Sequence, residues 1–412
     1  MAKPPTDVRI ESFALGMNTR KPDFRLGTEA GAFLRDALNV DITEAGTLKR
    51  RRGYELAVEA AGAHSLWSDG TSHYFVGSNM LYALDDELEA TAVAAVQPGR
   101  FVSYCTAPEG GAYWTDGAVL QRAVGSVTAP LNPPPPPLVP SAAAASGSLN
   151  AGRYTYCFTQ VDSAGRESAA THPEQILLEA DSAVAFDMPD APTAGNLVRA
   201  YLSGEGGTVP YLVYEFDSAG SYIADQPPSG IACATLGLAP MPAGSIVRHS
   251  NGRLLVAAGA ILYYSEPFAP GLCDPVSGYI PFPADITIVE PVEGGFFLVA
   301  DKTYWLAGDV ATASLTEVLP YGAVPGSGVS RRDSQSVHWM STRGIVEAAP
   351  GGAVKNLQDQ NVKVTPGSGG ATLVREANGM QQALSSMFGS STHQHATASS
   401  HMDAEIINGA TA

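Results

Sequence analysis

The four tryptophans of this 412-residue chain share one pattern, in which an extended run ends in Trp and a glycine turn follows. They are Trp67, Trp114, Trp305 and Trp339. Related pairs of short strand-forming runs recur every ~40–50 residues, which is the spacing of β-propeller blades. One small antiparallel sheet cannot bury its own faces, whereas sheets stacked around an axis cover one another. We therefore expect a β-propeller with these tryptophans packed between blades; a bowl-like β-sandwich would show similar alternation.

The composition also fits an all-β chain. Charged residues make up only 16% of the sequence, and there are 43 Gly and 30 Pro. This mixture disfavours long surface helices and coiled coils and suits short strands joined by turns. The hydrophobic fraction of 45% is too large for a disordered chain.

A different rhythm begins after a proline run at residues 133–137. The run 150–161 alternates, with Tyr154, Tyr156 and Phe158 on one face, and the tetrapeptide Asp-Ser-Ala-Gly closes two successive strand groups. Two-faced alternation with frequent turns predicts a small sandwich of the immunoglobulin or fibronectin type. We interpret the Pro/Ala/Ser stretch before it as a stiff linker rather than a ligand for an SH3-like partner.

These patterns divide the chain into six segments. They are an N-terminal arm with a β-hairpin (1–60), first propeller blades (61–132), a linker (133–147), a sandwich insertion (148–240), the remaining blades (241–360) and a C-terminal tail (361–412). In the tail, Leu373, Met380, Leu384 and Phe388 recur at roughly helical spacing, interrupted by Asn-Gly. We therefore expect a short, partly helical tail.

The cysteines and the apolar runs indicate the cellular compartment in which the protein is made. Cys105, Cys157, Cys233 and Cys273 have no short spacing, so the sequence predicts neither a zinc site nor a disulfide framework. We interpret them as buried free thiols in a reducing compartment. Because the sequence has no signal-peptide pattern and no run of ~18–20 apolar residues, we expect synthesis in a cytoplasm and no membrane insertion.

The sequence contains no local catalytic motif. It lacks a Gly-x-Ser-x-Gly elbow and a P-loop lysine, so we expect a protein that is not an enzyme and has no cofactor. His393, His395 and His401 could hold a metal if they lay on a strand, but no supporting ligands accompany them. A pair of distant carboxylates for glycoside hydrolysis stays open, because such pairs can come from separate blades.

The formal charge of −17 is unevenly distributed. Residues 1–52 hold ten basic and seven acidic residues, a net charge of +3, which leaves −20 for the rest of the chain. Such an acidic body disfavours non-specific DNA binding, which needs clusters of Lys and Arg. The run 49–52 could touch a phosphate, but it fits better a solvated turn or a contact with carboxylates of a neighbour.

The N-terminal segment carries a family resemblance. Residues 13–18, the strand around Asn39 and Asp41, and the basic return strand (Lys49, Arg50, Arg51 and Arg52 before a glycine) resemble phage tail and neck structural proteins. The resemblance is to the propeller-bearing nozzle or hub type, here with a fibronectin type III-like insertion. Residues 251–283 and 341–357 are similar to such virion proteins too. This chain is compact beside the larger nozzle proteins, which leaves its position in the tail open.

The resemblance implies a virion component that acts by assembly, in a ring commonly of six subunits whose lumen conducts DNA during genome ejection. The acidic body would repel the DNA phosphates, and the six hairpin residues would attach each subunit to a neighbour or to other tail or neck proteins. Residues 148–240 would face outward as a dock for tail fibres. Assembly would take place in the cytoplasm of the host bacterium, before the protein joins the virion tail.

Several alternatives remain from the sequence. One is a carbohydrate-binding or carbohydrate-cleaving propeller, such as a tailspike or receptor-binding protein. Another is a collar or fibre-attachment protein, and a third is a secreted adhesion protein.

Overall fold

The computed structural model describes residues 10, 12–28, 31–37, 40–43, 45–50, 56–330, 335–377, 380–388 and 402–408. The regular elements of these residues are nearly all strands, as predicted, with two single-turn 3-10 helices, η1 (Asp23–Arg25) and η2 (Pro350–Gly352). Among them, no helix has the length and apolar character of a membrane-spanning segment.

Five four-stranded antiparallel sheets of the described chain form blades. The first holds β5 (His64–Ser68), β6 (His73–Gly77), β7 (Met80–Leu84) and β8 (Ala90–Ala95). The second holds β9 (Ser103–Thr106), β10 (Ala112–Thr115), β11 (Leu120–Val124) and β12 (Val127–Pro130). The third holds β21 (Ile246–Ser250), β22 (Arg253–Ala258), β23 (Ile261–Tyr264) and β25 (Tyr279–Pro281). The fourth holds β26 (Ile288–Val292), β27 (Gly295–Val299), β28 (Thr303–Ala307) and β29 (Ser314–Leu319). The fifth holds β30 (Val329–Ser330), β31 (Val337–Ser341), β32 (Gly344–Ala349) and β33 (Ala353–Asn356).

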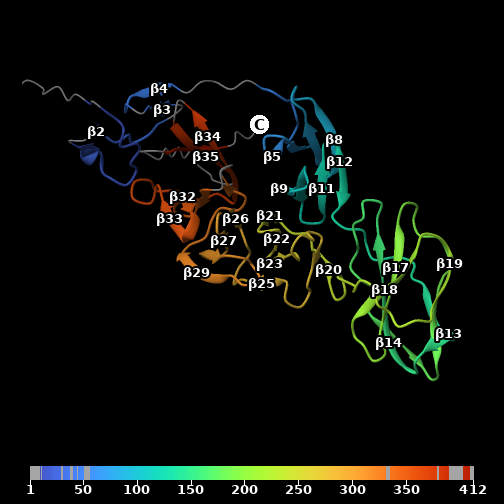
Figure 1. Cartoon of the computed structure of the whole chain (residues 1–412). Coiled ribbons are helices and arrows are strands. Elements are labelled where there is room, and N and C mark those ends of the chain that lie inside the picture. The colour runs from blue at the N-terminus through green and yellow to red at the C-terminus, as the bar shows by residue number, and fades with distance from the viewer. Residues whose placement is uncertain are drawn as a thin grey trace, which may run out of the picture.

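The five sheets follow one another around an arc in chain order (Figure 1). The first strands of the second to fifth sheets, β9, β21, β26 and β30, contact one another in turn. The last strands meet at the other side, where β8 contacts β12 and β29 contacts β33. First strands inside and last strands outside define radial blades. The predicted β-propeller is therefore confirmed as the fold.

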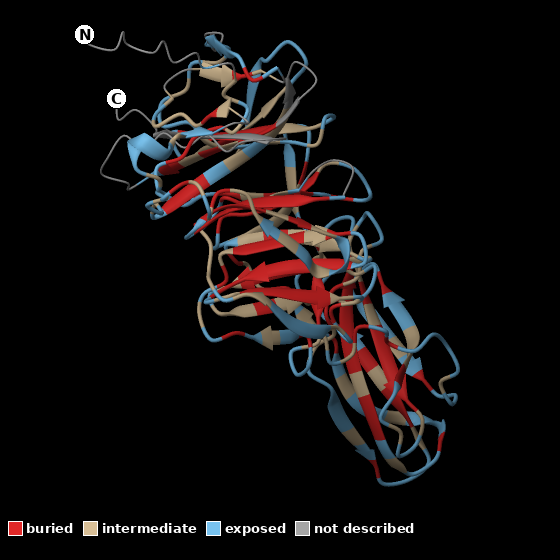
Figure 2. Ribbon diagram, turned by 90° about the vertical axis from the view of Figure 1, so that its left-hand side faces the viewer, coloured by how far each residue is buried: buried red, intermediate tan, exposed pale blue. Residues whose placement is uncertain are grey.

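Apolar side chains fill the spaces between consecutive sheets. Separate buried clusters join the first sheet to the second, the second to the third, the third to the fourth, and the fourth to the fifth. Figure 2 shows these buried stretches on the strands, stacked sheet upon sheet. Because each blade buries its faces only against its neighbours, the stack is held together mainly by removal of apolar surface from water.

The predicted helical tail is wrong. Residues in this region form a sixth sheet of β34 (Gly369–Ala377), β35 (Met380–Phe388) and β36 (Met402–Asn408), with β36 parallel to β35. Leu373 pairs directly with Leu384, and Ala377 pairs with Met380 across the Asn-Gly dipeptide. That dipeptide favours a two-residue hairpin, and it outweighs the helical spacing of the apolar residues.

The sixth sheet follows the fifth along the arc and brings the end of the arc back near the first sheet. β34 contacts β30 and β31 of the fifth sheet. On its other side, the ring of Phe388 stacks on that of Phe101, with 5.3 Å between centroids, and Phe101 lies in the connection from the first sheet to the second. The arc is therefore closed by an aromatic contact.

The insertion is a β-sandwich that projects from the propeller between the second and third sheets (Figure 1). Its seven strands are β13 (Ser141–Leu149), β14 (Gly152–Val161), β15 (Glu174–Leu178), β16 (Ser182–Met188), β17 (Leu197–Ser203), β18 (Pro210–Phe216) and β19 (Gly220–Ala224). One sheet has the order β13-β16-β19 and the other β15-β14-β17-β18. Tyr154, Phe158 and Phe186 contribute to the core between these sheets.

The boundary predicted between linker and sandwich is wrong, because the linker ends at residue 140. Residues 141–149, predicted as linker, form β13 and pair with β16. A Cβ atom on Gly147 would lie 2.4 Å from the Cβ of Ala183, so the close approach of these two strands requires a residue without a side chain there. The small residues of this stretch therefore fit an edge strand as well as a spacer.

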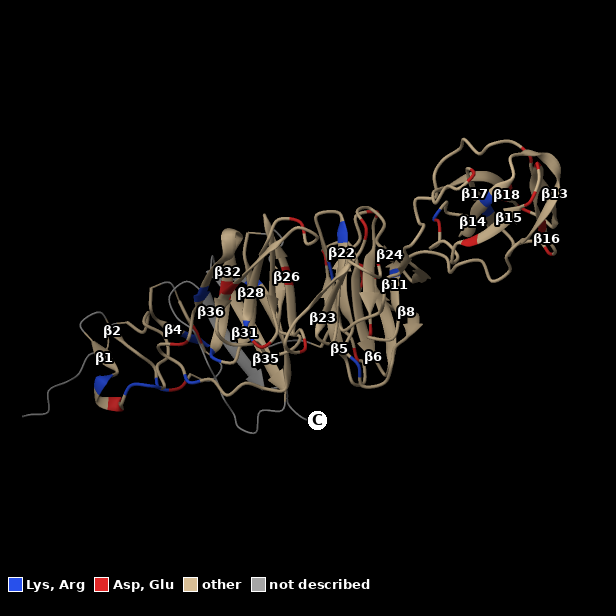
Figure 3. Cartoon of the chain, turned by 90° about the horizontal axis from the view of Figure 1, so that it is seen from below, with Lys and Arg blue, Asp and Glu red and all other residues tan. Residues whose placement is uncertain are grey.

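The N-terminal arm lies at one end of the molecule and the sandwich at the other (Figure 3). The arm contains two small hairpins, β1 (Gly27–Thr28) with β2 (Gly31–Ala32), and β3 (Val40–Ile42) with β4 (Leu48–Arg50). Met17, only 1% exposed, packs into a cluster with Met340 and Met387. Part of the predicted arm is therefore built into the last sheets of the propeller.

Candidate functional site

The predicted assembly hairpin lies on the arm. Asp41 pairs in register with Lys49, and Val40 pairs with Arg50. The side chains of Lys49 and Arg50 are exposed, whereas Asp41 is half-buried. Asn39, Arg51 and Arg52 lie outside the described residues. The described part of the hairpin thus presents two cations to solvent at the end opposite the sandwich (Figure 3).

A buried asparagine fixes the base of this arm. Asn18 is fully buried, and its side-chain Nδ2 donates to Oδ1 of Asn361 at 3.1 Å. The backbone N–H of Thr19 donates to the carbonyl of Asn361 at 2.9 Å, and the Arg20 guanidinium reaches the carbonyl of Val362 at 3.3 Å. No local sequence pattern indicates this attachment, because Asn18 and Asn361 are 343 residues apart in the chain.

The four tryptophans lie between blades, in two pairs. Trp67 and Trp114 belong to the cluster between the first and second sheets, and Trp67 stacks on Tyr104 with 5.6 Å between ring centroids. Trp305 and Trp339 belong to the cluster between the fourth and fifth sheets. Both of the latter contact the ring of Phe297, at centroid distances of 4.7 and 5.8 Å.

A chain of polar side chains joins four inner strands. We call this set, Ser103 on β9, Arg248 on β21, Glu290 on β26 and Ser330 on β30, the inner belt. Arg248 donates from Nη1 to the hydroxyl of Ser103 at 3.0 Å and from Nη2 to Oε1 of Glu290 at 2.6 Å. The hydroxyl of Ser330 donates to the other oxygen of Glu290 at 2.6 Å. The inner belt therefore links the second, third, fourth and fifth blades.

Charge compensation makes this belt possible. The side chain of Glu290 is 2% exposed and that of Arg248 is 20% exposed. Burial alone would lower the pKa of Arg248, but the Glu290 carboxylate beside it raises that pKa. A buried carboxylate is tolerated when a cation and further hydrogen bonds satisfy it. No local sequence signal marks the belt, since its four members come from four separate strands.

A cleft of about 570 Å³ lies where the sandwich meets the second and third blades. Its lining includes Glu109, Arg122, Asn132, Arg166, Glu167 and Phe268. Its volume is within the range of small-ligand sites, which often lie between domains. We call it the junction cleft.

The polar groups of the junction cleft mostly hold the two domains together. Arg166 donates to the carbonyls of Pro130 and Leu131, at 2.7 and 3.2 Å. Asn132 donates to the backbone carbonyl of Glu167 at 2.7 Å. These bonds cross from the propeller side to the sandwich, so they fix the angle at which the sandwich leaves the propeller.

Two further residues of the cleft, Glu167 and Phe268, differ in whether their side chains are available to a ligand. The carboxylate of Glu167 accepts from Thr159, Tyr201 and Arg199, at 2.5, 2.6 and 2.9 Å, and is therefore committed to structure. Phe268 is 89% exposed and has a φ of 57°, which is uncommon for a bulky residue. An exposed aromatic ring at a cleft suits contact with a flat apolar face of a ligand.

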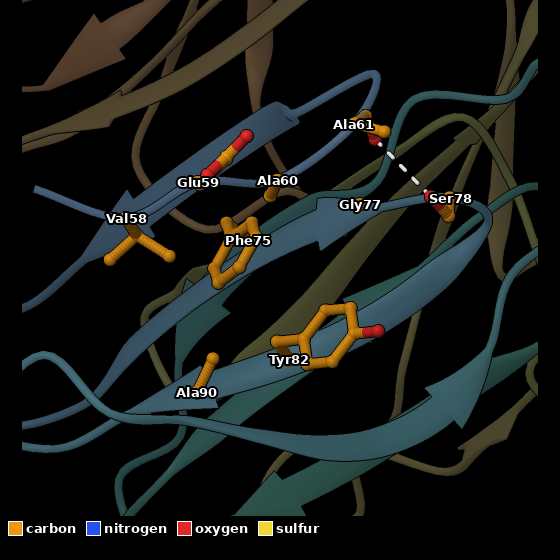
Figure 4. Close-up of a pocket in the computed structure, with 9 residues that line it drawn as sticks. All are labelled: Val58, Glu59, Ala60, Ala61, Phe75, Gly77, Ser78, Tyr82 and Ala90. Carbon is orange, nitrogen blue, oxygen red and sulfur yellow. Dashed lines mark hydrogen bonds between the residues drawn. The ribbon is translucent and has the colours of Figure 1, made fainter. Parts of the chain in front are cut away.

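A smaller pocket of about 260 Å³ opens on the first blade (Figure 4). Phe75 and Tyr82 stack in it with 5.2 Å between ring centroids, and segment 58–61 passes over them. The hydroxyl of Ser78 donates to the carbonyl of Ala61 at 3.4 Å. Glu59 is the one charged residue of this lining, so the pocket is a gap beneath a covering segment rather than a reactive centre.

The described residues contain no group of three His, Cys, Asp or Glu side chains arranged to hold a metal ion. His393, His395 and His401 lie outside the described residues. The aspartates of the turns behave as structural carboxylates: Asp69, Asp116 and Asp162 each accept two or more backbone N–H bonds. Asp217 accepts from the hydroxyl of Ser218.

Comparisons with known proteins add little. No family model and no curated protein matches the chain. Among solved structures, a streptogramin B lyase is 13% identical with a TM-score of 0.33, covering 77% of this chain and 89% of its own. A virginiamycin B lyase from Staphylococcus aureus is 10% identical, with a TM-score of 0.28 and coverages of 76% and 90%. A dipeptidyl peptidase 4 from Porphyromonas gingivalis is 10% identical, with a TM-score of 0.26 and coverages of 74% and 39%. At these scores the likeness bears on no activity or substrate of this chain.

Proposed function

We propose that the chain is a non-enzymatic structural protein of a phage virion, which assembles through its arm into a ring in the tail, commonly of six subunits. DNA would pass through the lumen between subunits during ejection, and the sandwich would dock tail fibres. The observation that carries the proposal is the placement of the exposed cations of β4 and the sandwich at opposite ends of the propeller (Figure 3).

The charges of the two ends support an assembly role. The sandwich, residues 141–240, has three basic and eleven acidic residues, a net charge of −8. The arm, residues 1–52, has a net charge of +3. Opposite charges at opposite ends favour contacts between the arm and an acidic surface of a neighbouring subunit or tail protein, and they disfavour stable adhesion of DNA to the body.

The test reverses the charge of the hairpin and leaves the fold intact. Deleting the arm would be uninformative, because Met17 belongs to the core of the last sheets. Instead, the double variant K49E/R50E of the full chain is compared with R100E/K355E, which makes the same charge change at exposed positions of the propeller. Native mass spectrometry and negative-stain electron microscopy measure the oligomer at low and physiological salt.

We expect wild type and R100E/K355E to form rings, and K49E/R50E to shift to monomers. A wild-type protein that stays monomeric at all concentrations, alone and with the adjoining tail proteins, would contradict the proposal. Equal loss of assembly in both double variants would contradict the role of the hairpin. Immunogold labelling of particles encoded by the same genome then tests the location, and absence of label from the tail would overturn it.

The junction cleft favours a second candidate, a propeller that binds carbohydrate. Its exposed Phe268, beside Arg122 and Asn132, is the kind of mixed aromatic and polar surface on which a sugar ring can lie. Isothermal titration calorimetry with host surface polysaccharide tests it. Saturable binding that is lost in F268A but kept in F24A, which removes another exposed phenylalanine, would favour this candidate. No binding by wild type would exclude it.

A further inference from the structure

The segment that returns from the sandwich to the propeller, residues 225–238, is attached to the outer face of the sandwich. We call it the return segment. The backbone N–H of Cys233 donates to the carbonyl of Pro210 at 2.9 Å, and that of Leu212 donates to Ile231 at 2.8 Å. Further on, the N–H of Ala170 donates to the carbonyl of Thr235 at 3.3 Å. The return segment thus crosses from the edge of β18 towards β14.

Two of the four cysteines meet under this segment. Cys157 lies on β14 and is fully buried, and Cys233 lies on the return segment and is 7% exposed. Together with Tyr201 they form one buried cluster. Contact between the two thiols raises the pKa of Cys157 and lowers that of Cys233, while burial opposes ionisation of both. Both thiols are free.

We propose that Cys157 and Cys233 are a redox-responsive pair, which forms a disulfide under oxidising conditions by exchange with a small-molecule disulfide. The Cys233 thiolate attacks one sulfur of the small disulfide and releases one small thiol. The Cys157 thiolate then attacks the Cys233 sulfur of this mixed disulfide and releases the second small thiol. Two protein thiols and one small disulfide thus give one protein disulfide and two small thiols.

The consequence is a covalent fastening of the return segment to the sandwich. In the reduced protein the segment is held by backbone hydrogen bonds and by the small buried cluster. The disulfide would close a long loop that contains most of the sandwich, which restricts the unfolded chain. The module that projects from the propeller would then resist local opening once the protein meets an oxidising medium. This role is independent of the assembly function proposed above.

The other two cysteines provide an internal control. Cys105 and Cys273 also share a buried cluster and are also free. However, Cys273 directs its thiol to the carbonyl of Pro240 at 3.9 Å, and burial raises the pKa of both thiols, that of Cys105 to about 12, so neither has the lowered pKa of Cys233. These two thiols are therefore poor partners for exchange.

The experiment oxidises the full chain with oxidised glutathione, then denatures it, alkylates the remaining thiols and maps the peptides by mass spectrometry. We expect the loss of two alkylatable thiols, a cross-linked peptide pair containing Cys157 and Cys233, and a rise in melting temperature that a reductant reverses. C105A/C273A should still form the cross-link, and C233A should not. Four alkylatable thiols after oxidation, or a link between Cys105 and Cys273 instead, would overturn the proposal. The wild-type peptide map decides this even where a variant fails to fold.

Discussion

Arg248 and Glu290 form an ion pair, with 2.6 Å between Nη2 and Oε1, which joins the inner strand of the third blade to that of the fourth. Ser330 of the fifth blade donates to the second oxygen of the same carboxylate. Three successive blades therefore meet at one buried carboxyl group.

Removing this carboxyl group should be costly. Glu290→Ala leaves a largely buried guanidinium unpaired, and we expect the free energy of unfolding to fall by about 3–5 kcal/mol. Urea denaturation measures it. Lys302 and Glu317 form a matched surface pair at 2.7 Å, with side chains 41% and 43% exposed, so Glu317→Ala should have a much smaller effect. Equal losses in the two variants would show that the inner belt contributes no more than a surface pair.

The tryptophans should differ in their contribution to stability. Trp339 is fully buried between the fourth and fifth blades, and Trp339→Ala should cost about 3–5 kcal/mol because it leaves a cavity. Trp67 is half-buried, so Trp67→Ala should cost distinctly less. Chemical unfolding of both variants gives the comparison. A larger loss for Trp67→Ala than for Trp339→Ala would contradict this expectation and would mean that Trp67 is packed more tightly than its exposure indicates.

Substitutions at two glycines distinguish the cost of backbone strain from the cost of a steric clash. Gly117 has a φ of 91° and no atom within 4 Å of an added Cβ, so Gly117→Ala should cost about 1–2 kcal/mol from the left-handed backbone alone. Gly111 has a φ of 77°, and its added Cβ would lie 2.1 Å from the carbonyl oxygen of Ala123. Gly111→Ala should therefore cost more, because strand β11 must move. Thermal unfolding measures both, and similar melting temperatures would contradict the steric argument.

The turn carboxylate of Asp162 should make stability depend on acid pH. Burial acts to raise the pKa of Asp162, but its bonds with the Arg166 side chain and backbone outweigh this and lower it. A lowered folded-state pKa gives stability that is complete above the unfolded value, about 3.9, and is lost as the pH falls through the folded value. Melting temperatures of wild type and D162N should therefore differ at pH 7 and converge towards pH 2. A constant difference across this range would rule out the linkage.

The blades could be predicted from the sequence because their signals are local. A glycine turn between strand-forming runs recurs around Trp67 and Trp114, and each hairpin folds next to its own turn. The tail shows the opposite case. There the spacing of Leu373 and Leu384 fitted a helix, but the strands on either side of the Asn-Gly dipeptide form a hairpin in which these two residues pair.

Features that depend on distant pairing could not be predicted. β13 consists largely of Ala, Ser and Gly, and it is a strand because β16 supplies its partners. The inner belt includes Ser103 and Glu290. No pattern in the sequence around either residue indicates that the two belong to one chain of hydrogen-bonded side chains. The attachment of Asn18 to Asn361 brings together residues from opposite ends of the chain. In each case the partner is specified by the closed propeller and not by the adjacent residues.

The points at which the chain leaves and re-enters the propeller are close neighbours in space. Leu131 and Met241 belong to one buried cluster between the second and third blades, although the whole sandwich lies between them in the sequence. Recombination at these two points would therefore exchange the projecting module without disturbing the contacts between blades. The sandwich and the propeller can consequently diverge at different rates during evolution.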